Sequence, residues 1–237
     1  LTPMGGRLLR RWLLRPLKNV RQIEKRLDAV EALVRDRRLR ERLREELRQV
    51  GDLERLAARV CTGRATPRDL MHLRLTLEQI PPIKQALADV SCDTLHRLAD
   101  QLTLCTQVVE RIRQALVDDP PASLSDGGVI RDGFNAELDE LREIARSGKD
   151  FIARLQQKEI ERTGIPSLKV GFNKVFGYYI EVTNAHRNKI PPHYIRKQTL
   201  VNAERYITPE LKEYEEKILS AEEKIASLEA ELFNRLR

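Results

Sequence analysis

The chain has 237 residues, of which 41% are hydrophobic, so it is long enough and apolar enough to bury a core. Charged residues make up 33% and aromatic residues 5%, a balance that favours long amphipathic helices with solvated faces over a compact β-sandwich. No run of 18 apolar residues is present, and the first six residues lack the apolar stretch of a signal peptide. These features exclude the membrane-spanning class and predict a cytoplasmic protein with no membrane partner.

The net charge of +7 is unevenly distributed along the chain. Residues 1–48 carry +8 and residues 164–208 carry +5, whereas residues 49–163 and 209–237 each carry −3. The first segment interleaves arginines with acids and holds one aromatic residue, Trp12, which favours solvated or partner-packed helix faces. Residues 164–208 hold six aromatic and only two acidic residues, a composition that favours a phosphate-binding surface over a merely soluble β-rich tip.

Residues 5–118 predict a succession of helices. Apolar spacing places them at residues 6–14, 20–34, 39–50, 52–61, from 67 onward, 93–102 and 106–117. Thr66 is a suitable N-cap, with Pro67 at the first helical position and Asp69 able to reach back to it. Pro81-Pro82 predicts a kink or an interruption in the helix that follows.

Two groups of residues in this region offer metal ligands, and both have a structural explanation. Cys92, His96 and Cys105 lack a fourth ligand at zinc-like spacing, and an odd number of cysteines in helical sequence indicates reduced thiols. The aspartates of the loop 118–128 lie among prolines, serines and glycines, where aspartate serves as a turn or cap residue. We therefore expect no metal and no cofactor in this chain.

Two heptad runs flank the basic, aromatic segment. The first falls at Phe134, Leu138, Leu141, Ala145, Gly148, Ile152 and Leu155, and the second at Leu211, Tyr214, Ile218, Ala221, Ile225, Leu228 and Leu232. Each run spans about 30 residues, or about 45 Å as a helix. Two seams of equal length predict an antiparallel helix pair. Ser147-Gly148-Lys149 interrupts the first run and predicts a bend.

The segment between the heptads changes from helical to strand-like spacing. Strands are predicted at residues 168–176, 178–183 and 194–200, with a loop at 184–193. Thr208-Pro209-Glu210 then restarts a helix, since threonine caps and proline suits the first helical position. The arrangement is a helix leaving the core, a small β tip and a helix returning.

The tip carries the candidate binding residues. The cations able to neutralise phosphates are Lys169, Lys174, Arg187, Lys189, Arg196, Lys197 and Arg205. The polar donors to phosphate oxygens are Asn173, Asn188, Gln198, Thr199 and Asn202. Such contacts position a duplex without reading its sequence. Phe172, Phe176 and Ile180 are expected to fill the core of the tip, and Tyr194 suits either core packing or contact with DNA.

Motifs of nucleotide and hydrolytic chemistry are missing from the chain. It holds no G-x-x-x-x-G-K-[ST], no G-x-G-x-x-G after a strand, and no convincing arrangement of histidine, serine and aspartate. The residues therefore predict a binding module and not an enzyme. Two alternatives stay open, a coiled-coil scaffold whose basic tip binds a protein partner and a helical protein that binds RNA.

Several motifs, in order along the chain, resemble the MutS family of DNA mismatch-repair proteins. Residues 2–17 (TPMGGRLLRRWLLRPL) and 51–55 (GDLER) resemble its core domain, 134–139 (FNAELD) the start of its outgoing lever helix, 168–173 (LKVGFN) and 177–180 (GYYI) its clamp, and 198–211 (QTLVNAERYITPEL) the exit into its returning lever. The resemblance implies a mainly α fold. A multi-helix core at 1–133 carries two long antiparallel lever helices at 134–163 and 209–237, with a small β-rich clamp at 164–208 inserted between them.

The resemblance also implies binding partners and the functions of other domains in the intact protein. In the intact protein, a homodimer grips duplex DNA by its backbone phosphates, recognises mismatches and forms an ATP-dependent sliding clamp. The levers relay the nucleotide state of an ATPase domain that uses ATP and Mg, and other mismatch-repair proteins such as MutL bind. The chain opens without methionine and holds neither the mismatch-reading domain nor the ATPase, so we expect a non-enzymatic fragment from a bacterial, nucleoid-associated cytoplasmic protein.

Overall fold

The protein folds as two compact units in the computed structural model, which describes residues 1–88, 90–173, 175 and 177–237. The N-terminal unit comprises residues 1–134 and 230–237, and the sheet unit comprises residues 135–229. Helix α10 (Pro209–Leu236) belongs mostly to the sheet unit and gives its last residues to the N-terminal unit. Phe233, on that last stretch, is fully buried.

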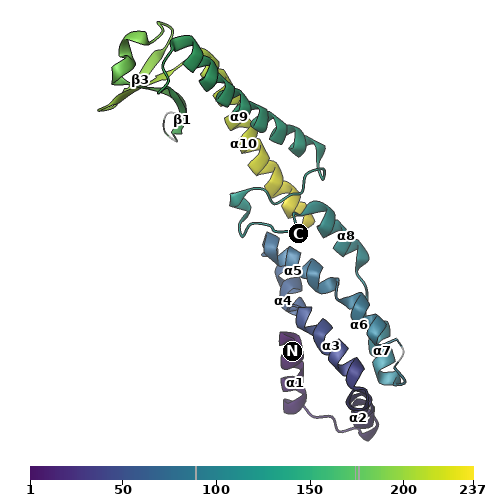
Figure 1. Ribbon diagram of the computed structural model, residues 1–237. Coiled ribbons are helices and arrows are strands. Elements are labelled where there is room, and N and C mark those ends of the chain that lie inside the picture. The colour runs from purple at the N-terminus through teal and green to yellow at the C-terminus, as the bar shows by residue number, and fades with distance from the viewer. Residues whose placement is uncertain (89, 174, 176) are drawn as a thin grey trace. The chain divides into compact units, whose positions relative to one another are not determined.

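The N-terminal unit is helical, as the spacing of apolar residues predicted. Its helices are α1 (Pro3–Leu14), α2 (Val20–Arg35), α3 (Arg37–Gln49), α4 (Leu53–Cys61), α5 (Pro67–Leu77), α6 (Ile80–Ala86), α7 (Asp93–Gln101) and α8 (Thr106–Ala115), with a 3₁₀ turn η1 (Leu124–Asp126) in the loop that follows (Figure 1). Within the described ranges, no helix is long and apolar enough to cross a membrane.

Helix α5 begins with the predicted capping arrangement. The Thr66 hydroxyl accepts a hydrogen bond from the Asp69 N–H, and the Asp69 carboxylate accepts from the Thr66 N–H, so the two residues satisfy each other's free groups. The helix ends at Leu77 and α6 starts at Ile80, with Pro81 in its first turn. The two prolines therefore interrupt the helix, because proline lacks the N–H that a continuous helix requires at that position.

The helices of the N-terminal unit pack in pairs. Helix α4 packs on α5, α5 on α8, α3 on α6, and α2 on both α3 and α7. One apolar cluster joins Leu43, Leu87 and Leu95 with smaller residues from the same helices. Helix α2 also leaves a heptad stripe exposed to solvent, formed by Val20, Ile23, Leu27, Val30 and Val34.

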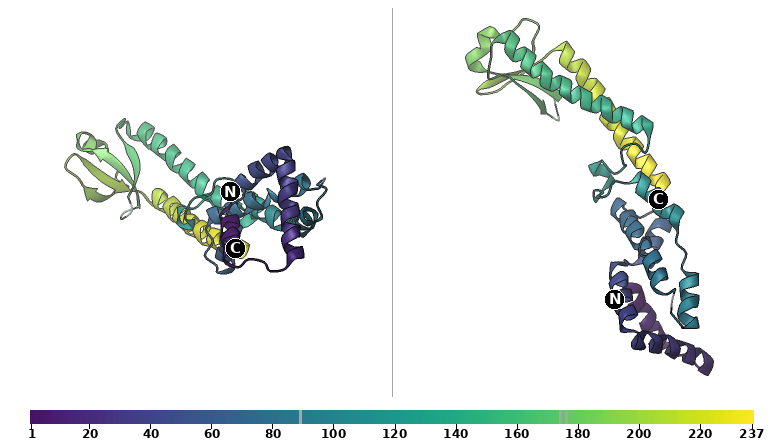
Figure 2. Two further views of the ribbon diagram at one scale, coloured as in Figure 1. Left: turned by 90° about the horizontal axis from the view of Figure 1, so that it is seen from below. Right: turned by 45° about the vertical axis from the view of Figure 1, so that its right-hand side comes forward.

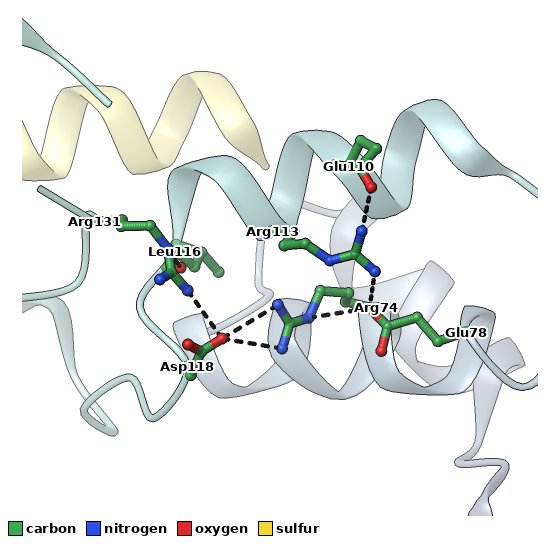
Figure 3. Close-up of polar contacts among 7 residues, drawn as sticks. All are labelled: Arg74, Glu78, Glu110, Arg113, Leu116, Asp118 and Arg131. Carbon is green, nitrogen blue, oxygen red and sulfur yellow. Dashed lines mark hydrogen bonds and ion pairs between the residues drawn. The ribbon is translucent and has the colours of Figure 1, made fainter. Parts of the chain in front are cut away.

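A network of ion pairs ties the loop after α8 to the helices beside it. Figure 3 shows Arg74, on α5, and Arg131 converging on Asp118, at N–O distances of 3.4 and 2.9 Å. Arg74 is buried and also pairs with Glu78, which in turn accepts from Arg113 at 2.9 Å. The hydrogen bond from Arg131 lowers the pKa of Asp118 below its ordinary value. Asp118 is therefore an ion-pair partner of two arginines and not the predicted turn or cap residue, a role that Asp126 takes in η1 by accepting a hydrogen bond from the Ser123 N–H.

The sheet unit is built from two long helices and a four-stranded antiparallel sheet. Its elements are α9 (Ala136–Thr163), β1 (Lys169–Asn173), β2 (Gly177–Thr183), the 3₁₀ segment η2 (Asn184–Lys189), β3 (Ile195–Thr199), β4 (Ala203–Ile207) and α10. Three strands were predicted, whereas β4 was not. Both views of Figure 2 show α9 and α10 side by side with the sheet beyond one end of α9.

Helices α9 and α10 run antiparallel, as the two heptad seams predicted. Their contacts pair early residues of one helix with late residues of the other: Arg142 with Glu229, Lys149 with Glu222 at 2.7 Å, and Lys158 with Glu210 at 3.9 Å. Phe151 also stacks on Tyr214, with ring centroids 3.4 Å apart. The heptad residue Leu138 is fully buried, and Leu155, Leu211 and Ile218 lie in the apolar cluster of the sheet unit.

Gly148 lies in close contact with Ile218 on α10. Helix α9 continues through Ser147-Gly148-Lys149 without a break in its hydrogen-bonded structure, so the glycine does not end the helix. A Cβ at this position would overlap Cγ1 of Ile218 on α10. Close approach to Ile218 therefore accounts for a residue without a side chain at this position, and the predicted bend stays a prediction.

The strands lie in the order β1-β2-β4-β3, with each neighbouring pair antiparallel. Ile180, Val182 and Tyr206 face a core that also holds Ile165 and Leu168. Ile180 is buried, as predicted, but Phe172 is 48% exposed and packs against the Tyr178 ring. The prediction that Phe172 fills the core is therefore wrong, because β1 lies at the edge of the sheet. Phe176 lies outside the described residues.

Candidate nucleic-acid interface

The sheet has one covered face and one open face. Strand residues alternate between the faces, so the buried positions Ile180 and Tyr206 place their neighbours Tyr179, Glu181 and Arg205 on the opposite, open face. Lys169 pairs with Glu181 across β1 and β2 and shares that open face. The predicted binding residues thus divide between the open face, the β3 edge and the loops.

Arg205 is anchored on the open face by three neighbours. Its guanidinium donates to Glu181 at 2.9 Å and to Gln198 at 3.0 Å, and it lies 4.1 Å above the Tyr179 ring. On β1, Gly171 lies beneath that ring, and a Cβ there would come within 2.8 Å of the Tyr179 hydroxyl oxygen. Because its charge is paired and its side chain is 19% exposed, Arg205 serves the sheet itself. Gln198 is occupied by the same contact.

Tyr194 belongs to the core. It is 8% exposed and packs in the cluster beneath the sheet, where its hydroxyl donates to Glu159 of α9 at 2.6 Å. Burial and the adjacent carboxylate raise the pKa of Tyr194 above its ordinary value. Of the two roles predicted for this residue, the structure supports packing, so we do not retain it as a DNA contact.

Arg187 and Arg196 meet on one buried carboxylate. Arg187, on η2, lies 2.9 Å from Oε1 of Glu204, and Arg196, on β3, lies 3.3 Å from the same oxygen. The other oxygen accepts a hydrogen bond from the Tyr206 hydroxyl. That bond and the two arginines hold the pKa of Glu204 below its ordinary value, while burial raises the pKa of Tyr206 to about 12.

The β3 edge presents further predicted cations and donors. The register between β3 and β4 shifts at Lys197, so this lysine is an extra, exposed residue in an edge strand. Lys189 is also exposed, with its ammonium 3.5 Å from the carbonyl of Gly164. The polar residues Asn188, Thr199 and Asn202 are exposed on the same segments.

Two predicted residues lie at the other edge of the sheet. Lys169 is exposed on β1, which is separated from β3 by two strands. Asn173 ends β1, and its side chain accepts a hydrogen bond from the Val175 N–H at 2.8 Å, which shapes the turn after the strand. Lys174 lies outside the described residues. The structure thus brings together the cations of η2 and β3 and keeps Lys169 apart from them.

Glu204 was missed by the sequence analysis. It lies on β4, the strand that was not predicted, and its side chain is 3% exposed. The available signal was the alternation of Ala203-Glu204-Arg205-Tyr206, which puts Glu204 and Tyr206 on one face. An acidic residue at an inward strand position needs cationic partners, and Arg187 and Arg196 provide them.

The described residues offer no group of three His, Cys, Asp or Glu side chains that could hold a metal ion. Cys92 is buried in the cluster of the N-terminal unit, and Cys105 adopts a left-handed backbone conformation just before α8.

Comparison with known proteins decides the family. The model of MutS domain III matches residues 1–237. The chain belongs to the MutS family. It is 64% identical over its whole length to the DNA mismatch repair protein MutS of Salinibacter ruber and 52% identical over its whole length to that of Phocaeicola vulgatus. MutS of Symbiobacterium thermophilum is 53% identical over the same extent.

The chain spans about a quarter of the length of these MutS relatives, 26% in one case and 27% in the other two. The match to MutS domain III agrees with the mainly helical fold and its small antiparallel sheet.

Proposed function

We propose that the chain binds duplex DNA through backbone phosphates, without reading sequence, inside a longer mismatch-repair protein. The observation that carries the proposal is the set of exposed cations on η2 and β3, namely Arg187, Lys189, Arg196 and Lys197. Within residues 164–208 only two acids oppose seven cations, and both acids are already paired to arginine. Excess fixed positive charge of this kind attracts a polyanion and displaces its counterions.

In this proposal α9 and α10 act as levers and residues 164–208 as the clamp that they support. The ion pairs and stacked rings between the helices support a stiff connection, because each contact fixes the register of one helix against the other. Such a connection would carry a change at the distant end of the helices to the clamp.

We further propose that reaction chemistry belongs to other parts of the longer protein. We assign four functions to those other parts: a nucleotide site for ATP and Mg, mismatch reading, homodimer formation and contact with a MutL-type partner. The reason is that the relatives are named DNA mismatch repair protein MutS and extend well beyond this chain. The chain itself binds without reacting.

The proposal is tested by measuring fluorescence anisotropy of a labelled duplex with the 237-residue chain over a salt series. We expect equal affinity for a perfectly paired and a mismatched duplex, and a steep loss of affinity as salt rises, because phosphate contacts carry no sequence information. A marked preference for the mismatched duplex would overturn the assignment of mismatch reading to another part of the protein. Detectable turnover of ATP by the same preparation would overturn the assignment of reaction chemistry.

A scaffold that binds a protein partner is the second candidate. Its supporting observation is the exposure of two apolar side chains in turns of the sheet unit, Val201 at 92% between β3 and β4 and Val175 at 80% between β1 and β2. Salt-insensitive or absent binding to duplex DNA would favour this candidate. Tighter binding to an RNA duplex in competition would instead favour an RNA partner.

A further inference from the structure

Glu204 is an unusual residue for a surface meant to hold phosphate. It is an acid with 3% of its side chain exposed on β4, the neighbour of the edge strand β3 that carries Arg196 and Lys197. Burying a carboxylate costs free energy unless charged or hydrogen-bonding partners compensate for the lost water. The contacts of Glu204 show which groups compensate for its burial.

Each oxygen of the Glu204 carboxylate has a separate role. Oε2 accepts from the Tyr206 hydroxyl, two residues along the same strand, which fixes the orientation of the carboxylate. Oε1 takes both arginines, Arg187 at 2.9 Å and Arg196 at 3.3 Å. Because they share one oxygen, the two guanidinium groups converge although they come from different elements.

The arginines remain largely open to solvent. The Arg187 side chain is 59% exposed and that of Arg196 is 54% exposed. A guanidinium carries five N–H donors in a planar fork, and each arginine makes an ion pair with Glu204 through one of its nitrogen atoms. Donors therefore remain for a ligand outside the sheet. Two cations on one carboxylate also leave an excess of one positive charge at this point.

A pair of arginines held in this way suits a phosphate group. Arginine binds phosphate through two parallel hydrogen bonds, which require the planes of the guanidinium groups to be oriented. Free arginine side chains lose rotational entropy when they bind, and side chains already held in place lose less. An anchoring carboxylate can therefore raise affinity for an anion although it carries the same sign of charge.

We propose that Glu204 is a positioning residue that holds Arg187 and Arg196 as a preset pair for one phosphate group of the DNA backbone. The inference rests on the DNA-binding function proposed above and adds to it the residue that organises the contact. Arg187 and Arg196 touch the phosphate, whereas Glu204 acts through them.

The direction in which one substitution changes DNA affinity distinguishes a positioning role of Glu204 from a simple effect of its charge. Glu204→Gln keeps the size of the side chain but removes its negative charge, so the protein gains one unit of net positive charge. Simple charge counting expects tighter binding to a polyanion. We expect weaker binding instead, by roughly three- to tenfold, the scale of one hydrogen bond of ordinary net strength. Affinity is measured by anisotropy of a labelled duplex at fixed salt.

Glu181→Gln is the matched control. Glu181 is the other acid of residues 164–208, it also pairs with an arginine, and its loss changes the net charge by the same amount. We expect this variant to bind DNA as tightly as the unchanged chain or more tightly. Arg187→Ala and Arg196→Ala should each weaken binding and lower the salt slope by about one. Adding Glu204→Gln to the double alanine variant should not weaken binding further, since the residue acts through the two arginines and only its negative charge is then lost.

The outcomes distinguish failure of the inference from failure of the proposed function. The inference about Glu204 would be overturned, and the DNA-binding function kept, if binding is salt-sensitive and weakened in both alanine variants but Glu204→Gln binds DNA equally well or more tightly. No salt-sensitive binding by the unchanged chain would overturn both. Where circular dichroism shows that Glu204→Gln does not fold, the double variant Arg187→Lys/Arg196→Lys carries the test. This variant keeps both positive charges but loses the planar guanidinium groups. Unchanged affinity for the duplex would therefore overturn the proposal that Arg187 and Arg196 form an oriented pair for phosphate.

Discussion

Tyr194 shows that a residue type suited to nucleic-acid contact can serve the core instead. Aromatic residues among cations are typical of nucleic-acid surfaces, yet this ring is buried and its hydroxyl donates to a glutamate that is itself buried, Glu159. The sequence offered no way to choose, because the choice depends on where α9 places Glu159 relative to the strand. Arg205 is similar, since Glu181 and Gln198 on neighbouring strands hold a cation that otherwise suits phosphate.

Tyr194→Phe should therefore lower stability and leave DNA binding unchanged. Removing the hydroxyl takes one hydrogen-bond donor from Glu159, at a cost of about 1–3 kcal/mol in the free energy of unfolding. The measurement is urea unfolding followed by circular dichroism. Tyr179→Phe is the control, with an expected change within about 0.5 kcal/mol, since the Tyr179 hydroxyl has no hydrogen bond among the described residues. Weaker DNA binding by folded Tyr194→Phe would restore Tyr194 to the interface.

A second residue-scale prediction concerns Asp52, which caps α4. Arg7 donates two hydrogen bonds to its carboxylate, each 2.7 Å, and lowers the pKa of Asp52 to about 2. A carboxyl group whose pKa is depressed by folding stabilises the folded state above its unfolded pKa, near 4, and loses that contribution as pH falls toward 2. The stabilisation that the pair provides is thus lost between about pH 4 and about pH 2.

Thermal unfolding of Arg7→Ala beside the unchanged chain tests this window. The gap between their melting temperatures should be constant above about pH 4 and should narrow toward pH 2, as Asp52 becomes protonated in both proteins. The gap should also shrink in high salt, because Arg7 is exposed and the interaction is screened. A gap that stays the same from pH 5 to pH 2 would contradict the role of Asp52.

At the scale of elements, periodicity predicted the helices well and the sheet in part. Each predicted helix of the N-terminal unit has an observed counterpart with similar ends, because apolar spacing and caps such as Thr66 are local features. Strand β4 was missed because it carries Glu204 and Arg205 side by side, and adjacent charges argue against a covered strand. Their partners lie on η2, β2 and β3, so the reason that β4 is stable is not local.

The close approach of α9 and α10 yields a prediction at Gly148. Gly148→Val should destabilise the sheet unit by about 1–3 kcal/mol, since the new side chain overlaps Ile218 and the helices must move apart. Ser147→Val is the matched control, because Ser147 is the exposed neighbour on the same helix and valine costs less than about 0.7 kcal/mol there. Equal effects of the two changes in chemical unfolding would mean that the helices are not in tight contact at this point.

At the scale of the whole molecule, the order of segments could be predicted but the assembly of the site could not. The heptads and the strand-like segment between them give a helix pair with an inserted sheet, and the domain III match agrees with a mainly helical chain. Residues 187, 196 and 204 are spread over three elements, and no spacing rule relates them. Their meeting on one oxygen depends on the strand order β1-β2-β4-β3, which places β3 against β4.

The η2 and β3 edge of the sheet unit is proposed to bind backbone phosphates. The most informative test of this proposal is the salt dependence of duplex binding for two variants that each lose four positive charges. One replaces Arg187, Lys189, Arg196 and Lys197 by alanine, and the other replaces Arg38, Arg42, Arg44 and Arg48, which are exposed on α3. We expect the first variant to bind weakly with a salt slope reduced by roughly one per cation in contact, and the second to keep most of its affinity and slope. Loss of binding in the α3 variant, with the η2 and β3 variant unaffected, would contradict the account and move the contact to the N-terminal helices.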